Sequence, residues 1–76
     1  MSDLEKRLSE ISQEQLDKIA GGLAREQIMS DLRRNFPEVN NAYLTRYLEL
    51  LESGKSLADT MLILGDEFPD PRNQTN

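Results

Sequence analysis

VNNAYLTRYLELLESG, residues 39–54, carries the broadest apolar face of this 76-residue chain. Its apolar side chains recur three and four positions apart, which places them on one side of an α-helix. They are Val39, Tyr43, Tyr47 and Leu50, flanked by Leu44, Leu48 and Leu51. Gly54 predicts the end of this helix, because glycine readily adopts the left-handed conformation that commonly closes one.

A further helix is predicted on each side of this stretch. Residues 23–36 carry an apolar side chain at every fourth position, and Pro37 then prevents a simple continuation of the helix. On the other side, Ser56 followed by Asp59 resembles a helix start, and Gly65 is expected to end this short helix. The apolar positions of the two segments are Ala24, Ile28, Leu32, Phe36, Leu57, Met61, Leu62 and Leu64.

The sequence before Gly22 predicts one more amphipathic helix, over residues 3–20. Its apolar residues fall within about 120° on a helical wheel; they are Leu4, Leu8, Ile11, Leu16 and Ile19. Ser2 with Glu5 forms a plausible capping box at the start, and Ser12 with Gln15 a second one, so a break near Ile11 is an alternative. Such a helix is marginal alone in water and needs a partner, in another protein or in the rest of this chain.

These segments together predict an all-α protein. A compact unit of about three short helices, residues 23–68, is preceded by the amphipathic helix, and the chain divides at Gly22. From Pro69 onward the sequence PDPRNQTN offers nothing apolar to bury, so residues 69–76 are expected to be disordered.

Composition excludes several classes of function. The net charge of −5, from 14 acidic and 9 basic residues, disfavours binding to nucleic acids or to anionic membranes. The chain has no cysteine and no histidine, so it lacks thiolate zinc ligands and the commonest general base. The sequence predicts neither a secretory signal peptide nor a membrane span, because no long apolar run occurs. We therefore expect no catalytic residues, no metal site and no cofactor.

The twelve residues 11–22, ISQEQLDKIAGG, carry the most specific motif. They resemble the leader of double-glycine precursor peptides, the bacteriocin-like substrates of peptidase-containing ABC transporters, whose usual form is L-S-x-x-E-L-x-x-I-x-G-G. Gly21 and Gly22 match the final pair, and Ile19, Leu16 and Ile11 match the apolar anchors. Ile11 replaces the commoner leucine, and Gln15 stands where an acid is common. The resemblance covers residues 1–22 and leaves the fold of residues 23–76 open.

The resemblance implies a precursor in two functional parts. Residues 1–22 would be a leader bound through Leu8, Ile11, Leu16 and Ile19 by the cysteine-peptidase domain of the transporter. Cleavage after Gly22, within Gly21-Gly22-Leu23, would release residues 23–76 as exported cargo. The precursor would be cytoplasmic, the cargo secreted, and the membrane reached only through the transporter. Apolar side chains on one helical face suit a groove, and two glycines let an extended backbone pass through a narrow channel.

Ordinary helix capping is the alternative interpretation of the same residues. Gly21 would then be the left-handed residue that ends the helix, and Gly22 would turn the chain. The stripe from Leu4 to Ile19 would pack on the rest of the chain. In that case the protein is a small cytoplasmic helical module that binds a partner protein.

Overall fold

A central helix, α3 (Asn41–Glu52), organises the fold in the computed structural model, which describes residues 3–72. Its buried side chains are Tyr43, Leu44, Tyr47, Leu48, Leu50 and Leu51. The Asn40 side chain caps its start by accepting a hydrogen bond of 2.8 Å from the Ala42 amide. Gly54, with φ of 85°, closes its end as predicted.

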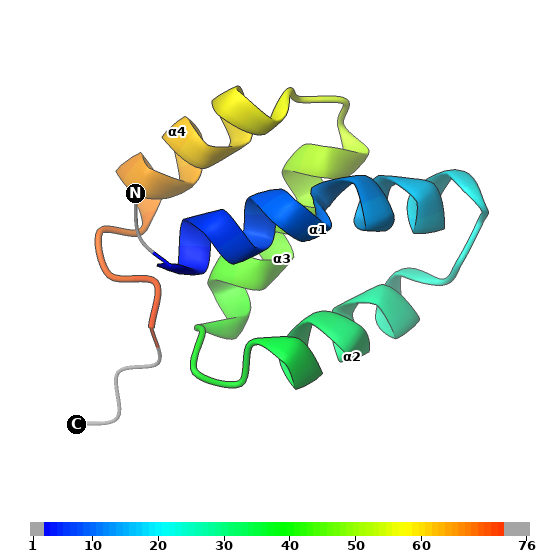
Figure 1. The fold of residues 1–76 in the computed structure, drawn as a ribbon, viewed down its shortest axis with the longest axis horizontal. Coiled ribbons are helices and arrows are strands. Elements are labelled where there is room, and N and C mark those ends of the chain that lie inside the picture. Colours follow the sequence, from blue (N-terminus) through cyan, green and yellow to red (C-terminus); the bar gives the residue numbers. More distant parts are fainter. Residues whose placement is uncertain (1–2, 73–76) are drawn as a thin grey trace.

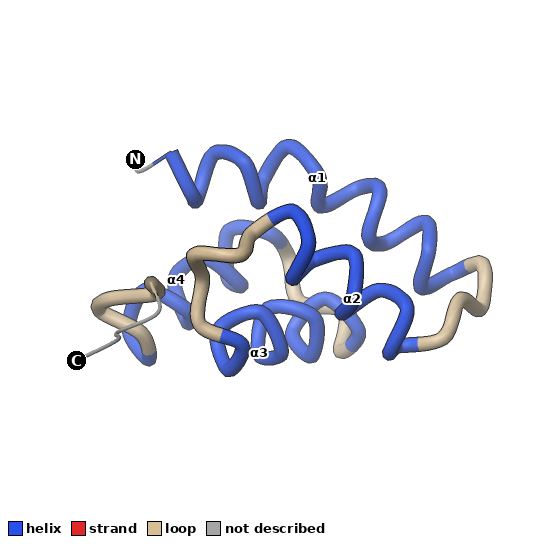
Figure 2. The backbone as a smooth tube through the Cα atoms, turned by 90° about the horizontal axis from the view of Figure 1, so that it is seen from below, coloured by secondary structure: helices blue, strands red, loops and turns tan. Residues whose placement is uncertain are grey.

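Three other helices surround α3: α1 (Asp3–Ala20), α2 (Arg25–Asn35) and α4 (Leu57–Glu67) (Figure 1). α1 contacts each of the other three helices, and Figure 2 shows it as a layer of its own on one side of them. The predicted all-α class is therefore confirmed, and residues 3–72 contain four packed helices with no strand among them. The amphipathic N-terminal helix finds its partner within this chain.

α1 runs without a break, so the alternative start at Ser12 is not used. The Ser12 hydroxyl instead donates a hydrogen bond of 2.9 Å to the Ser9 carbonyl oxygen, one turn earlier in the same helix. Ser2, the other predicted cap, lies outside the described residues.

α2 begins two residues later than the sequence predicts. The Leu23 amide donates to the Lys18 carbonyl oxygen at 3.1 Å, so Leu23 belongs to the closing turn of α1. α2 then buries Ile28, Met29 and Leu32 and ends before Phe36 and Pro37.

The predicted end of α4 before Gly65 is wrong, because the helix continues to Glu67. Its start is as predicted, since the Ser56 hydroxyl accepts a hydrogen bond from the Asp59 amide at 3.1 Å. Gly65 has no positive φ and therefore stays helical. Phe68 fixes the end instead: its amide donates to the Leu64 carbonyl oxygen, and its ring packs edge-on against Tyr43 at 5.5 Å.

Part of the predicted disordered tail is described. Pro71 accepts a hydrogen bond of 2.8 Å from the Asn40 amide, and Arg72 bridges Val39 in antiparallel fashion. Backbone hydrogen bonds thus hold residues 71–72 against the connection between α2 and α3, although the tail buries little. Residues 73–76 lie outside the described part of the chain.

Candidate functional site

The double glycine forms the closing turn of α1, at the far end of the molecule from the start of that helix (Figures 1 and 2). The Gly22 amide donates to the Ile19 carbonyl oxygen, and the Leu23 amide to that of Lys18, both at 3.1 Å. Gly22 has φ of 79°, so the left-handed residue is Gly22 and not Gly21 as the capping interpretation expects. This pair of hydrogen bonds is the usual glycine-closed helix end, known as a Schellman turn.

Gly21, Gly22 and Leu23 are all exposed, and the bond after Gly22 therefore lies on the surface. Leu23 is 43% exposed although it is large and apolar. The turn is nevertheless compact, so an extended path through a narrow channel requires its two capping hydrogen bonds to open.

The four predicted recognition residues share α1 but differ in accessibility. Leu8 is fully buried in the core, whereas Ile11 and Ile19 are partly buried against it. Leu16 is 37% exposed and does not belong to the core cluster. The fold thus packs three of the anchors against the core and leaves Leu16 the most exposed of the four.

Gln15 takes a core position on α1 that sequence reasoning missed. It is only 2% exposed, and among the described residues no hydrogen-bond donor reaches its Oε1 atom. Gln15 lies seven residues after Leu8 and four after Ile11, and this spacing puts all three on one face of the helix. The spacing is the sequence feature that could have predicted the burial of Gln15. A carboxylate here, as is common in the resembling leaders, would be a buried charge without a partner.

A buried hydrogen bond ties α1 to the centre of the fold. The Tyr47 hydroxyl on α3 donates to the Leu8 carbonyl oxygen at 3.1 Å. Burial, and secondly the neighbouring Tyr43, raises the pKa of Tyr47 well above its ordinary value. The neutral hydroxyl that donates this bond is therefore the favoured form in the folded chain.

Polar contacts fasten both ends of α1 to the segment around α2. Near the end of α1, Lys18 pairs with Asp31 at 3.3 Å. Near its start, Arg7 donates to the Asn35 carbonyl oxygen at 2.9 Å and pairs with Glu38 at 3.1 Å. The Arg7 guanidinium also lies 4.6 Å from the centre of the Phe36 ring. These contacts join residues distant in sequence and have no local signature.

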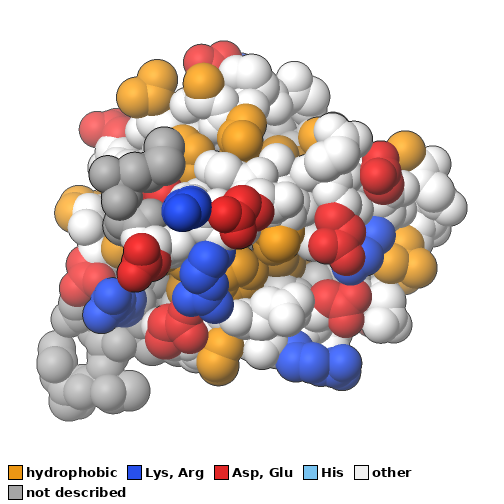
Figure 3. All heavy atoms as spheres, in the orientation of Figure 1, with side chains coloured by type: hydrophobic (Ala, Val, Ile, Leu, Met, Phe, Trp, Pro, Cys, Tyr) orange, Lys and Arg blue, Asp and Glu red, His pale blue; other side chains and the backbone are white. Residues whose placement is uncertain are grey.

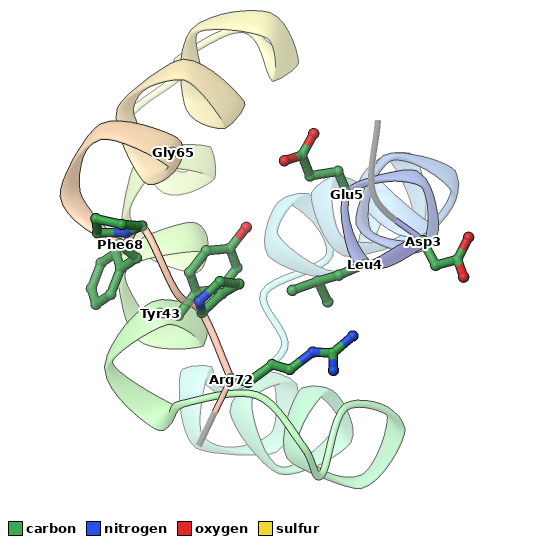
Figure 4. A pocket seen from close by; sticks show the side chains of 9 residues that line it. Asp3, Leu4, Glu5, Tyr43, Gly65, Phe68 and Arg72 are labelled. Carbon is green, nitrogen blue, oxygen red and sulfur yellow. The ribbon is translucent and has the colours of Figure 1, made fainter. Parts of the chain in front are cut away.

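A cavity of about 360 Å³ lies where the start of α1 meets Tyr43, the end of α4 and residues 68–72 (Figure 4). The Tyr43 hydroxyl and the Glu5 carboxylate face the same space. Burial raises the pKa of Tyr43, and the negative charge of Glu5 raises it further. In the described part of the chain, no three acidic side chains are grouped so that they could hold a metal ion.

A second hollow, of about 630 Å³, runs between α1 and α4. On the α1 side it is lined by Glu5 and Ser9. On the α4 side its lining is mainly apolar and consists of Leu57, Ala58, Met61, Leu62 and Gly65. Leu62 is 73% exposed, the most of any large apolar side chain among residues 3–72. Hydrophobic side chains reach the surface over α4, at the top of Figure 3. We call this hollow the α1–α4 groove.

The chain matches no protein-family model, and the comparisons with curated proteins and with solved structures found no match. None of the described helices is both long and apolar enough to cross a membrane. Residues 3–72 present three surface features: an exposed turn after α1, a cavity at the start of α1, and the α1–α4 groove.

Proposed function

We propose that this chain is a precursor peptide whose first 22 residues are a double-glycine leader. A peptidase-containing ABC transporter would cleave it after Gly22 and export residues 23–76. The observation that carries the proposal is the position of Gly21-Gly22-Leu23. These residues follow the anchor-bearing helix directly, and they lie exposed in the connection between α1 and α2, outside the core.

The folded precursor must open locally before such a peptidase can bind every anchor. Leu8, Ile11 and Ile19 contact the core, and a peptidase groove would need the same side chains. Each buried apolar side chain of this size contributes roughly 1.5–3 kcal/mol, whereas the whole domain is stable by only about 4–11 kcal/mol. The core and the transporter therefore compete for α1. Burial of the anchors in the peptidase groove offsets much of the free-energy cost of detaching α1 from the core.

Leu16 and Leu23 support a first contact that requires no unfolding. Both are large apolar residues that remain exposed on the folded chain, on either side of the glycines. A peptidase that engages Leu16 holds the Gly22–Leu23 bond nearby while the rest of α1 leaves the core. Recognition would then proceed from the end of α1 toward its start.

The test is in vitro processing of the full chain by the purified peptidase domain of such a transporter. Cleavage should yield a fragment that begins at Leu23, as identified by mass spectrometry. Leu16→Asp should abolish processing, and circular dichroism should show that the variant is still helical, because Leu16 lies outside the buried core. Leu62→Asp is the matched control, since Leu62 is even more exposed and lies outside the leader. Equal cleavage of both variants would rule out recognition through Leu16.

The packing of α1 favours a second candidate, a helical interaction module that is never cut. Gly22 closes a helix with the same hydrogen bonds as Gly54, and this capping role accounts for a glycine there without any peptidase. The mass of the species outside producing cells separates the two candidates. Cargo beginning at Leu23 supports the precursor, and an intact chain found only inside the cells supports the module.

A further inference from the structure

Gly65 is an unusual residue for its place in α4. A glycine inside a helix lowers stability relative to alanine, and here the fold gains nothing in return. Its φ is not positive, and a Cβ atom added to it would meet no atom within 4 Å. Neither backbone conformation nor internal packing requires this glycine. Gly65 lines the α1–α4 groove and also the cavity at the start of α1.

The residues around Gly65 shape that groove for a helix. Ala58 and Gly65 are seven positions apart and share a face of α4, and both lack bulk. Met61 and Leu62 lie between them, and Leu62 projects into solvent. A helix laid across this face would bury Leu62 and approach the backbone closely at Gly65.

The charges beside the groove indicate the chemistry of that helix. Asp59 and Asp66 lie three positions before and four after Leu62, which makes them its neighbours on the helix surface. Both are exposed, and neither forms an ion pair with another described residue. Glu5 lines the opposite side, and α4 contains no basic residue. The apolar surface is therefore bordered by negative charge.

We propose that the α1–α4 groove binds a basic amphipathic helix of another protein. Its apolar stripe would cover Met61 and Leu62, and its flanking lysines or arginines would pair with Asp59 and Asp66. A second copy of this chain is a poor occupant, because it would bring the same acidic border and a net charge of −5. The groove takes one wall from residues 3–20 and the other from residues 57–67, so only the uncut chain presents it. The inference does not depend on cleavage after Gly22.

The probe is a synthetic 18-residue amphipathic helix with a leucine stripe and a lysine-rich polar face. A second peptide with glutamate in place of each lysine is the matched control. Titration calorimetry with the full chain should detect binding of the lysine peptide alone. Asp59→Asn with Asp66→Asn should weaken it at least tenfold, whereas Glu26→Gln, on the exposed surface of α2, should not. Leu62→Glu should abolish binding. Leu23→Glu is the matched control, because it replaces another exposed leucine that lies away from the groove, and it should not weaken binding.

Gly65→Ala is the decisive variant because stability and binding should change in opposite directions. Alanine should raise the melting temperature by a few degrees, since it favours the helix and meets open space. The same methyl group should weaken binding of the lysine peptide at least tenfold. Unchanged binding by Gly65→Ala, or equal binding of both peptides, would overturn the proposal. So would a dimer in sedimentation that dissociates on Leu62→Glu, since the occupant would then be a second copy.

Discussion

Gly22 and Gly54 are the residues of the described chain whose backbone has a positive φ, 79° and 85°. Each closes a helix with the same pair of hydrogen bonds, and an added Cβ would meet no atom within 4 Å at either position. Valine at either residue should therefore lower stability by a similar amount, about 1–2 kcal/mol, because left-handed backbone disfavours a branched side chain. Thermal unfolding followed by circular dichroism measures both changes.

The cleavage rate should distinguish valine at Gly22 from valine at Gly54, although both substitutions should lower stability by a similar amount. Gly22→Val places a branched side chain beside the scissile bond, and a misplacement of ~1 Å can slow a reaction by about 100-fold. This variant should bind the peptidase domain and compete with the wild type, yet remain uncut. Gly54→Val should be cut at least as fast as the wild type. Normal cleavage of Gly22→Val would show that Gly22 is not the cleavage position.

Tyr47 makes stability depend on alkaline pH. Its pKa is raised in the folded chain, so above about pH 10 the unfolded state loses protons more readily than the folded state. The contribution of Tyr47 to the free energy of unfolding should therefore be complete below about pH 10 and should fall as the pH rises further. Tyr47→Phe should make this decline shallower, and urea unfolding between pH 7 and 11 checks it. An unchanged slope would mean that Tyr47 ionises equally in both states.

At the scale of elements, the sequence predicts helices better than their boundaries. α3 can be predicted from the sequence because both its apolar face and the glycine that ends it are local features. The end of α4 is not, because a contact between Phe68 and Tyr43 decides it, and these residues are 25 positions apart. The same holds for α1: periodicity predicts the helix, but not that Leu8 is buried while Leu16 is exposed. The apolar stripe of α1 is broad, and its sequence does not specify which side of it meets the core. The partner helices decide this.

Gln15 tests whether docking of α1 controls processing. Gln15→Leu removes a buried acceptor that lacks a partner and should stabilise the chain by about 1 kcal/mol. Gln15→Glu should destabilise it by about 3–5 kcal/mol, because it buries an unpaired charge. If the core and the peptidase compete for α1, the leucine variant should be cut more slowly and the glutamate variant faster. Gln27→Glu, exposed on α2, is the control and should change neither stability nor cleavage rate.

On the scale of the whole molecule, the position of α1 decides what cleavage would do. α1 contacts α2, α3 and α4 and buries Leu8 among them, and Tyr47 donates its hydroxyl to α1. Removal of residues 1–22 would therefore leave Tyr47 without that acceptor and expose apolar surface on the three remaining helices. α3 would keep its contacts with α2 and with α4, which do not involve the leader. The same sequence would thus form a closed domain before cleavage and an open one after it.

The fragment 23–76 should accordingly remain substantially helical but be much less stable than the full chain. A loss of Leu8 alone removes roughly 1.5–3 kcal/mol of burial, a large share of a total of about 4–11 kcal/mol. Circular dichroism should show helix in the fragment with a lower and broader melting transition, and a dye that binds exposed apolar surface should fluoresce with the fragment only. Addition of a synthetic peptide of residues 1–22 should restore the sharp transition, whereas the same peptide with Leu8→Asp should not. A fragment with a random-coil spectrum would mean that residues 23–76 cannot fold without α1, and would favour the uncut interaction module over the precursor.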